Sequence, residues 1–247
     1  ALPAGPDPRL ALEFCGLAFA SPLVLLSGCV GFGEEYTRVE GFSNRDAGAV
    51  CLKGTTLAPR LGNAPHRIAE TGAGMLNAIG LQNPGAHQVV DGILPALDFS
   101  ETRFIANVSG STVEEYEAVT RLFDASPIDA IEINISCPNV KEGGVQFGND
   151  PDMSARVVEV CRRATGKPLI TKLSPNQTDI AGNARRCIEA GTDAFEDAED
   201  LEADIAELED LLESIVSAHE QVSELASTVP ELRGALEDAE GDDEDDE

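Results

Sequence analysis

The residues best suited to chemistry are a thiol and several hydrogen-bonding side chains that directly follow an apolar alternating run. The run, residues 131–135, predicts a buried strand, and Ser136, Cys137, Pro138 and Asn139 come next. Parallel α/β folds place their catalytic groups at the carboxyl ends of strands. We therefore expect Cys137 to lie in an active site, where its thiolate can accept a proton.

Polar or small residues also end the other apolar runs, and the set comprises Ser27, Lys53, Asn107, Asn134 and Lys172. A single lysine is usually a solvated surface charge. Two lysines that each close a buried strand are harder to explain in that way. The recurrence favours an enzyme over a purely structural α/β protein.

The elements that position these residues are five predicted strands, over residues 22–27, 47–52, 104–108, 130–135 and 169–173. A sixth strand is expected to begin at residues 193–195. Three helices are predicted between them: one capped by Ser111 or Thr112 and running through 116–123, one over 152–164, and one over 178–190 closed by Gly191. Repeated strand–loop–helix units predict a parallel sheet or barrel.

Composition excludes several classes of function. The chain has 247 residues and a net charge of −28, and residues 196–247 alone carry 22 acidic residues against one basic residue, Arg233. This negative field repels nucleic acid and anionic membranes, so neither is an expected partner. Six scattered cysteines without a C-x-x-C pair, and only three histidines, make a metal site in this chain unexpected.

Most of the cysteines are expected to be small buried side chains in a reducing compartment. The sequence contains neither a signal-peptide pattern nor an apolar stretch of 18 residues. A cytoplasmic protein is therefore expected.

Five blocks in order resemble the dihydroorotate dehydrogenases, and in particular the catalytic subunit of their two-subunit, NAD-linked branch. The blocks are SGCVGFG at 27–33, KGTTLAPRLGN at 53–63, RIAET to GMLNAIGLQNPG at 67–85, NISCPNVKEGG at 134–144 and KLSPN at 172–176. The resemblance covers about residues 10–195. It implies FMN-dependent oxidation of dihydroorotate to orotate in pyrimidine (UMP) biosynthesis.

The resemblance also implies roles for individual residues. Cys137 would be the base that removes the C5 proton, while a hydride passes from C6 to flavin N5. The residues expected to bind FMN are Ser27, Lys53, Gly54, Asn107, Asn134 and Lys172. The residues expected to bind substrate are Lys53, Asn77, Ala78, Ile79, Gly80, Leu81, Asn134 and Asn139. Taken alone, Asn77 and Asn139 would more often be turn residues.

A partner subunit is implied as well. It would carry FAD and an iron–sulfur cluster and pass electrons to NAD. This chain has no G-x-G-x-x-G dinucleotide motif of its own, which agrees with that division of labour.

The resemblance ends near Phe195, whereas the family would continue into strands seven and eight, whose glycine-rich loops bind the FMN phosphate. We therefore expect an incomplete TIM (β/α)8-type barrel of five to six β/α units over residues 1–195, the partial FMN-binding domain. Apolar residues then alternate by four and three from Leu201 to Val229, which predicts an acidic helix or coiled coil over 196–236. The acidic run 237–247 is expected to be disordered.

The coiled-coil stripe requires a partner helix, and a homo-oligomer would supply one; a solvated helix that pairs with nothing is the alternative. The tail also leaves a second hypothesis for function. The chain would then be a truncated, non-catalytic remnant whose acidic coiled coil acts as an oligomerisation or interaction module.

Overall fold

The computed structural model describes residues 7–72, 74–136, 148–174 and 179–195. All of these lie in the first of the two units of the chain, Ala1–Ala198. Cys137 and Asn139, together with the predicted tail over 196–247, lie outside the described residues.

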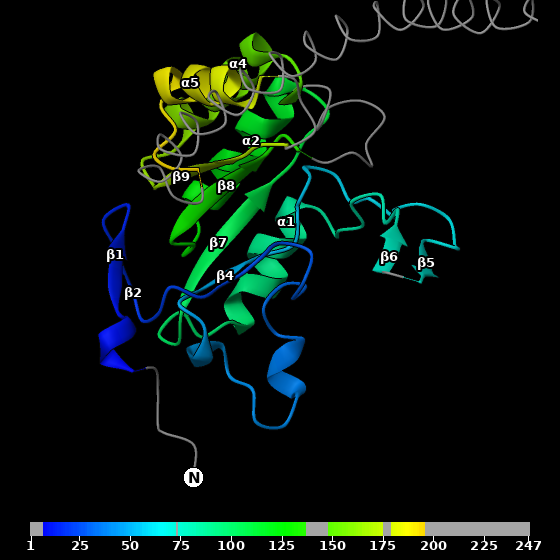
Figure 1. Cartoon of the computed structure of the whole chain (residues 1–247), viewed down its shortest axis with the longest axis vertical. Coiled ribbons are helices and arrows are strands. Elements are labelled where there is room, and N and C mark those ends of the chain that lie inside the picture. Colours follow the sequence, from blue (N-terminus) through cyan, green and yellow to red (C-terminus); the bar gives the residue numbers. More distant parts are fainter. Residues whose placement is uncertain (1–6, 73, 137–147, 175–178, 196–247) are drawn as a thin grey trace, which may run out of the picture. The chain divides into compact units, whose positions relative to one another are not determined.

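The centre of this unit is a parallel sheet of five strands in the order β3-β4-β7-β8-β9. The strands are β3 (Val24–Leu25), β4 (Ala49–Cys51), β7 (Arg103–Val108), β8 (Ala130–Asn134) and β9 (Leu169–Lys172). The strands of this sheet lie beside one another in chain order. The sheet curls into a half-barrel (Figure 1). A parallel bridge between Ile170 and Ala194 continues the order beyond β9. The five predicted strands and the start of a sixth are therefore confirmed.

Helices α2 (Val113–Asp124), α4 (Pro151–Ala164) and α5 (Ile180–Ala190) pack side by side over the convex face of the sheet (Figure 1). Thr112 caps α2, because its hydroxyl accepts a hydrogen bond from Glu115 N at 3.2 Å. Gly191 ends α5 at φ +104°, a left-handed conformation that suits glycine. These three helices agree with the predicted ones.

A further helical segment precedes β7, and it consists of α1 (Ala86–Gln88), the π-helical η4 (Val89–Ile93) and η5 (Leu94–Ala96). The shorter 3-10 turns are η1 (Pro8–Leu10), η2 (Tyr36–Arg38) and η3 (Asn44–Asp46).

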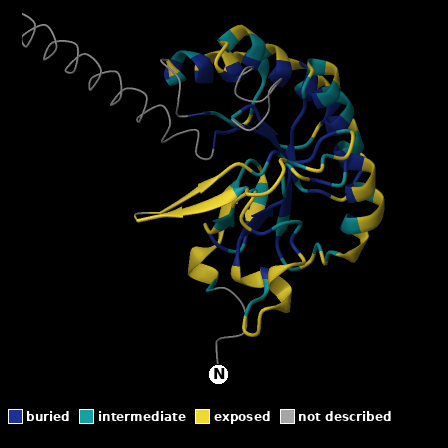
Figure 2. Ribbon diagram, turned by 90° about the vertical axis from the view of Figure 1, so that its right-hand side faces the viewer, coloured by how far each residue is buried: buried dark blue, intermediate teal, exposed yellow. Residues whose placement is uncertain are grey.

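Two antiparallel hairpins stand apart from the main sheet. Strands β1 (Leu12–Phe14) and β2 (Leu17–Phe19) place Phe19 in the apolar core beneath the sheet. Strands β5 (Ile68–Thr71) and β6 (Gly74–Asn77) form an arm whose eight residues are all exposed (Figure 2). The sequence patterns predicted neither hairpin.

Side chains alternate between the two faces of the sheet, as the strand period requires. The concave face carries a layer of small and apolar residues near the amino ends of the strands, comprising Ala49, Ile105, Ala130 and Ile170. Two residues further along each strand, the same face carries Cys51, Asn107, Glu132 and Lys172. The concave face therefore changes from apolar to polar toward the carboxyl ends of the strands.

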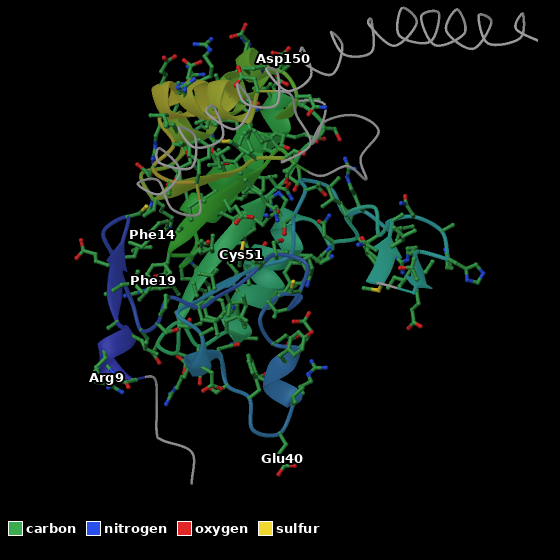
Figure 3. All side chains as sticks on the ribbon, in the orientation of Figure 1. Arg9, Phe14, Phe19, Glu40, Cys51 and Asp150 are labelled. Carbon is green, nitrogen blue, oxygen red and sulfur yellow. The ribbon has the colours of Figure 1, made fainter. Side chains whose placement is uncertain are left out.

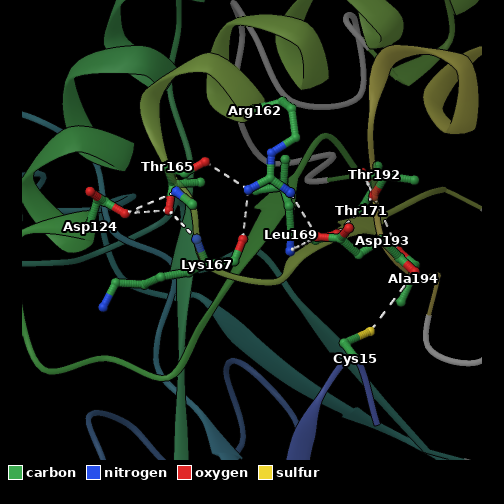
Figure 4. A network of polar contacts seen from close by, with 11 residues as sticks. Cys15, Asp124, Arg162, Thr165, Lys167, Leu169, Thr171, Thr192, Asp193 and Ala194 are labelled. Atoms are coloured by element: carbon green, nitrogen blue, oxygen red, sulfur yellow. Dashed lines mark hydrogen bonds and ion pairs between the residues drawn. The ribbon is translucent and has the colours of Figure 1, made fainter.

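At the opposite, amino-terminal end, a polar network joins the loops that precede the strands (Figure 4). Thr165 Oγ1 donates to Asp124 Oδ1 at 2.6 Å, and Lys167 Nζ donates to the carbonyls of Ser126 and Ile128 at 2.9 and 2.7 Å. These bonds join the end of α2 and the residues after it to the segment between α4 and β9. Within the described part of the chain, no helix is long and apolar enough to cross a membrane.

Candidate functional site

The carboxyl ends of β7, β8 and β9 bring four polar side chains to one edge of the half-barrel. Asn107 on β7 is in register with Glu132 on β8, and Asn134 on β8 is in register with Lys172 on β9. Asn107, Glu132 and Asn134 are buried, and Lys172 is half-buried. Enzymes with parallel α/β folds place their catalytic groups at the carboxyl ends of the strands, as these buried polar side chains are placed.

Three of these side chains, Asn107, Glu132 and Asn134, form a continuous series of hydrogen bonds. Asn107 Nδ2 donates to Glu132 Oε1, and Asn134 Nδ2 donates to Asn107 Oδ1 at 3.2 Å. Asn134 Oδ1 in turn accepts hydrogen bonds from the backbone N–H and the hydroxyl of Ser136, at 3.2 and 3.1 Å. The series of hydrogen bonds therefore starts at Glu132 on β8, passes through Asn107 on β7 and Asn134, and ends at Ser136, just after β8. Tyr116 of α2 fixes the same strand end by donating to Asn134 O at 2.7 Å.

The thiol of Cys51 lies among the charged groups of this edge, and Figure 3 labels its place in the sheet. Burial raises the pKa of Cys51 well above its ordinary value, and the Glu132 carboxylate raises it further by its charge and by a hydrogen bond. The charge of Lys172 and the N–H of Ser27 act in the opposite direction. Burial and the Glu132 carboxylate thus keep this thiol protonated at neutral pH.

The loop after β4 approaches this cluster through its backbone. Thr55 N donates to Asn107 O at 2.9 Å, and Lys53 N donates to Gly31 O at 2.8 Å. A Cβ placed on Gly54 would lie 2.9 Å from Asn107 Oδ1 and 3.0 Å from Leu81 Cδ2. Only glycine fits this close approach without displacing its neighbours.

The segment 79–81 lies beside Gly54 and has an unusual backbone conformation. Leu81 has φ +53°, a left-handed conformation that costs a non-glycine residue about 1–3 kcal/mol and is concentrated at functional sites. Asn83 holds the segment in place: its Oδ1 accepts from Thr56 N at 3.2 Å, and its Nδ2 donates to Leu81 O at 2.7 Å. Strain at Leu81 is therefore sustained by the buried amide of Asn83.

The predicted site residues thus fall into three groups. In the first group, Gly54 and Asn134 lie against Asn107, and Leu81 lies beside Gly54. Lys172 is in register with Asn134, the Ser27 N–H contacts the Cys51 thiol, and Lys53 directly precedes Gly54 in the loop after β4. Gly80 is buried and Ile79 half-buried beside Leu81, whereas Asn77 and Ala78 are exposed at the base of the β5–β6 arm, where Asn77 pairs with Ile68. Cys137 and Asn139 lie outside the described residues, and their predicted roles stay predictions.

A flat, hydrogen-bonding cofactor such as FMN fits the groups present at this edge. Among the residues that the structure describes, the buried Ser109 hydroxyl has no hydrogen-bond partner. A Cβ placed on Gly54 would lie 3.3 Å from the Ser109 hydroxyl oxygen, so this unsatisfied polar group lies in the closely packed cluster around Gly54. Amide donors and two lysines complete a set suited to the carbonyl and ring-nitrogen edge of a flavin.

Sequence reasoning missed three members of this cluster, Cys51, Ser109 and Glu132. Glu132 carried the one available signal, because it is the only charged residue within the predicted strand 130–135. No cluster of three or more His, Cys, Asp or Glu that could hold a metal ion occurs in the parts of the chain that the structure describes.

Comparison with known families gives two matches. The family model described as "Dihydroorotate dehydrogenase" matches residues 9–198. A second model, described as "Family of unknown function (DUF5790)", matches residues 180–237. The two matches overlap across α5 and the residues that follow it.

Among curated relatives, the chain is similar to two proteins named "Dihydroorotate dehydrogenase B (NAD(+)), catalytic subunit". It is 49% identical over 188 residues to that of Oceanobacillus iheyensis, covering 76% of this chain and 61% of the relative. It is 47% identical to that of Geobacillus kaustophilus, covering 76% of this chain and 59% of the relative. The chain therefore spans about three-fifths of the length of these relatives.

A solved structure supports the fold. The crystal structure of DHODH in complex with ferulenol from Eimeria tenella superimposes with a TM-score of 0.61 at 20% identity, covering 76% of this chain and 59% of that one. At this identity the likeness concerns the fold alone.

Proposed function

The chain belongs to the dihydroorotate dehydrogenase family, and we propose that it provides the flavin- and substrate-facing edge of an enzyme that oxidises dihydroorotate to orotate in pyrimidine biosynthesis. The observation that carries the proposal is the buried polar cluster at the carboxyl ends of β7, β8 and β9. The chain spans only 61% of the length of the Oceanobacillus iheyensis relative, so the activity of the whole enzyme is part of this proposal.

The proposed cofactor is FMN, which accepts the hydride from dihydroorotate C6 when bound. Ser27, Gly54, Asn107 and Asn134 would hold the ring by hydrogen bonds and close backbone approach. The ammonium groups of Lys53 and Lys172 would stabilise the negative charge that the ring gains near N1 on reduction.

The proposed substrate-binding residues are Lys53, the segment 77–81, Asn134 and Asn139. Orotate offers a carboxylate and an imide edge, which one cation and several amide groups match in charge and hydrogen bonding. Asn77 and Ala78 lie at the exposed end of β6, so they would contact substrate only if the β5–β6 arm folds toward the strand ends.

Cys137 is the proposed base. Its thiolate would take the C5 proton as the hydride leaves C6, so that the carbon–carbon double bond of orotate forms. The N–H and hydroxyl of Ser136, the residue directly before this cysteine in the sequence, are hydrogen-bonded to Asn134.

A partner subunit with FAD and an iron–sulfur cluster would reoxidise the flavin with NAD. The relatives named as catalytic subunits of an NAD(+) enzyme support this proposal.

The decisive experiment is an anaerobic visible spectrum of the purified full chain with added FMN and then dihydroorotate. We expect retained flavin whose absorption band bleaches with substrate. Cys137→Ala should retain flavin but lose at least about a hundredfold in bleaching rate, the usual contribution of a general base. Cys29→Ala is the control, since this thiol is exposed. Equal bleaching rates in wild type and Cys137→Ala would refute the assignment of the base.

A second candidate function rests on the match of residues 180–237 to a different family. In this proposal residues 196–236 form an acidic coiled coil that joins copies of the chain. High salt would then strengthen self-association by screening the acidic side chains. Sedimentation that gives a monomer at both low and high salt would eliminate it.

A further inference from the structure

We infer that Glu132 is a positioning residue: its buried carboxylate fixes the orientation of the Asn107 and Asn134 amides and, through them, the backbone N–H and hydroxyl of Ser136. The effect of this orientation on ligands rests on the proposed function, in which these amides face flavin and orotate. The hydrogen-bond chain that carries it belongs to the described residues alone.

The direction of each hydrogen bond depends on which groups can donate. An ionised carboxylate accepts hydrogen bonds only, so Asn107 must turn its Nδ2 toward Glu132. The Asn107 Oδ1 then faces Asn134, which must donate from its own Nδ2 at 3.2 Å. Asn134 Oδ1 is left to accept the N–H and hydroxyl of Ser136. One acceptor-only group therefore decides the direction of each later bond.

Burial makes one orientation of the two amides strongly preferred. Glu132 is 5% exposed, Asn107 is fully buried and Asn134 is 8% exposed, so turning either amide over would leave buried atoms with mismatched partners. Such mismatches cost the full desolvation of the groups, because water does not replace the lost bonds. Charge-assisted bonds to a carboxylate are also stronger than neutral ones.

The orientation has a chemical consequence for ligands. Asn134 Oδ1 already accepts two hydrogen bonds, so this amide can offer a ligand only its remaining N–H. Asn107 likewise keeps one N–H beyond its bond to Glu132. Carbonyl oxygens, such as those of a pyrimidine dione or the flavin pyrimidine ring, are the groups that match two amide donors.

Glu132→Gln tests the chain without a ligand. Side-chain amide NMR of the isotope-labelled full chain should show the Asn107 and Asn134 NH2 signals and the Ser136 backbone N–H shifting together. Asp129→Asn is the control, because this carboxylate binds Arg103 and the Phe104 N–H at the other end of β7. It should leave the Ser136 signal unchanged. A shift confined to Asn107 in Glu132→Gln would overturn the inference.

A reciprocal double variant provides the rescue. In Glu132→Gln combined with Asn107→Asp, the new amide can donate to the new carboxylate, which still accepts from Asn134. We expect the Asn134 and Ser136 signals to return to their wild-type positions, although the single variant displaces them. A simple loss of stability would not be rescued in this way, and signals that stay displaced would refute the relay.

Ligand binding separates the inference from the proposed function. With FMN bound, Glu132→Gln should weaken orotate binding about tenfold, the effect of losing one oriented hydrogen bond, with a flavin affinity still measurable by fluorescence quenching. Unchanged orotate affinity would contradict the positioning role. Absence of flavin binding by wild type would refute the proposed function, while the NMR comparison would still decide the inference.

Discussion

Arg162 Nη1 donates to Asp193 Oδ2 at 2.7 Å, and the same carboxylate oxygen accepts Leu169 N–H at 2.7 Å (Figure 4). Arg162 Nη2 also donates to the carbonyls of Thr165 and Lys167, at 2.7 and 2.8 Å. One guanidinium therefore joins the end of α4 to the start of β9 and to the residue that precedes Ala194. This network lies at the amino ends of the strands, opposite the candidate site, where barrel residues serve stability.

Arg162→Ala should accordingly lower the free energy of unfolding by about 2–3 kcal/mol, because it removes the guanidinium bonds to two carbonyls and to the Asp193 carboxylate. Urea unfolding of the full chain measures the effect. Arg163→Ala is the control, since its ion pair with Glu159 is exposed and worth about 0.5 kcal/mol or less. Equal losses in the two variants would show that the network contributes no more than a surface pair.

Gly54→Ala should abolish or strongly weaken FMN binding while costing about 1–3 kcal/mol of stability, as overpacking does. The added methyl would meet Asn107 Oδ1 at 2.9 Å and Leu81 Cδ2 at 3.0 Å, so the cluster must shift. Flavin fluorescence quenching and thermal unfolding measure the two effects. Gly166→Ala is the control, because its Cβ would meet nothing within 4 Å. Wild-type flavin affinity in Gly54→Ala would refute the role given to this surface.

The main sheet was predictable because each strand is an apolar run ended by turn or polar residues. The sequence predicted Ser111 or Thr112 as the cap of α2, where the structure has Thr112, and Gly191 as the end of α5. Both were readable because local hydrogen bonding and φ decide them. The two hairpins lacked such a signal. The β5–β6 arm exposes both of its faces, so no alternation of apolar and polar residues marks it as strand.

The candidate site was predictable only in part. Strand-end polar residues and the family resemblance identified Asn107, Asn134 and Lys172. Glu132 was missed because its role depends on Asn107, 25 residues earlier in the chain, and only the parallel register of β7 and β8 brings the two together. Sequence spacing carries no trace of such a tertiary contact.

Ser109→Ala should weaken FMN binding without lowering stability. The buried Ser109 hydroxyl has no hydrogen-bond partner within the described ranges, so removing it costs the folded protein no bond and can even stabilise it. Ser21→Ala is the matched control, because the Ser21 hydroxyl is buried and unpartnered to the same extent in the described structure but precedes β3 rather than following β7. Identical flavin affinities in the two variants would remove Ser109 from the proposed site.

The buried thiols predict a loss of stability at high pH. Burial raises the pKa of Cys161 from its ordinary value of 9.0 to about 12, and the Thr120 hydroxyl, 3.3 Å from the sulfur, opposes this only in part. Burial likewise raises the pKa of Cys187 to about 12. Above pH 9 the unfolded chain releases these protons while the folded chain keeps them. The unfolded state then binds fewer protons, so the free energy of unfolding falls as pH rises from 9 toward 12.

Each such thiol contributes a slope of up to about 1.4 kcal/mol per pH unit in that range, and none below it. Urea unfolding at several pH values between 8 and about 11 should show the onset of this decline. Cys161→Ala should flatten the slope by the share of one thiol. Val158→Ala, a truncation of a fully buried side chain on the same helix, should lower stability at every pH and keep the wild-type slope. If Cys161→Ala keeps that slope as well, the Cys161 thiol is not held protonated by burial.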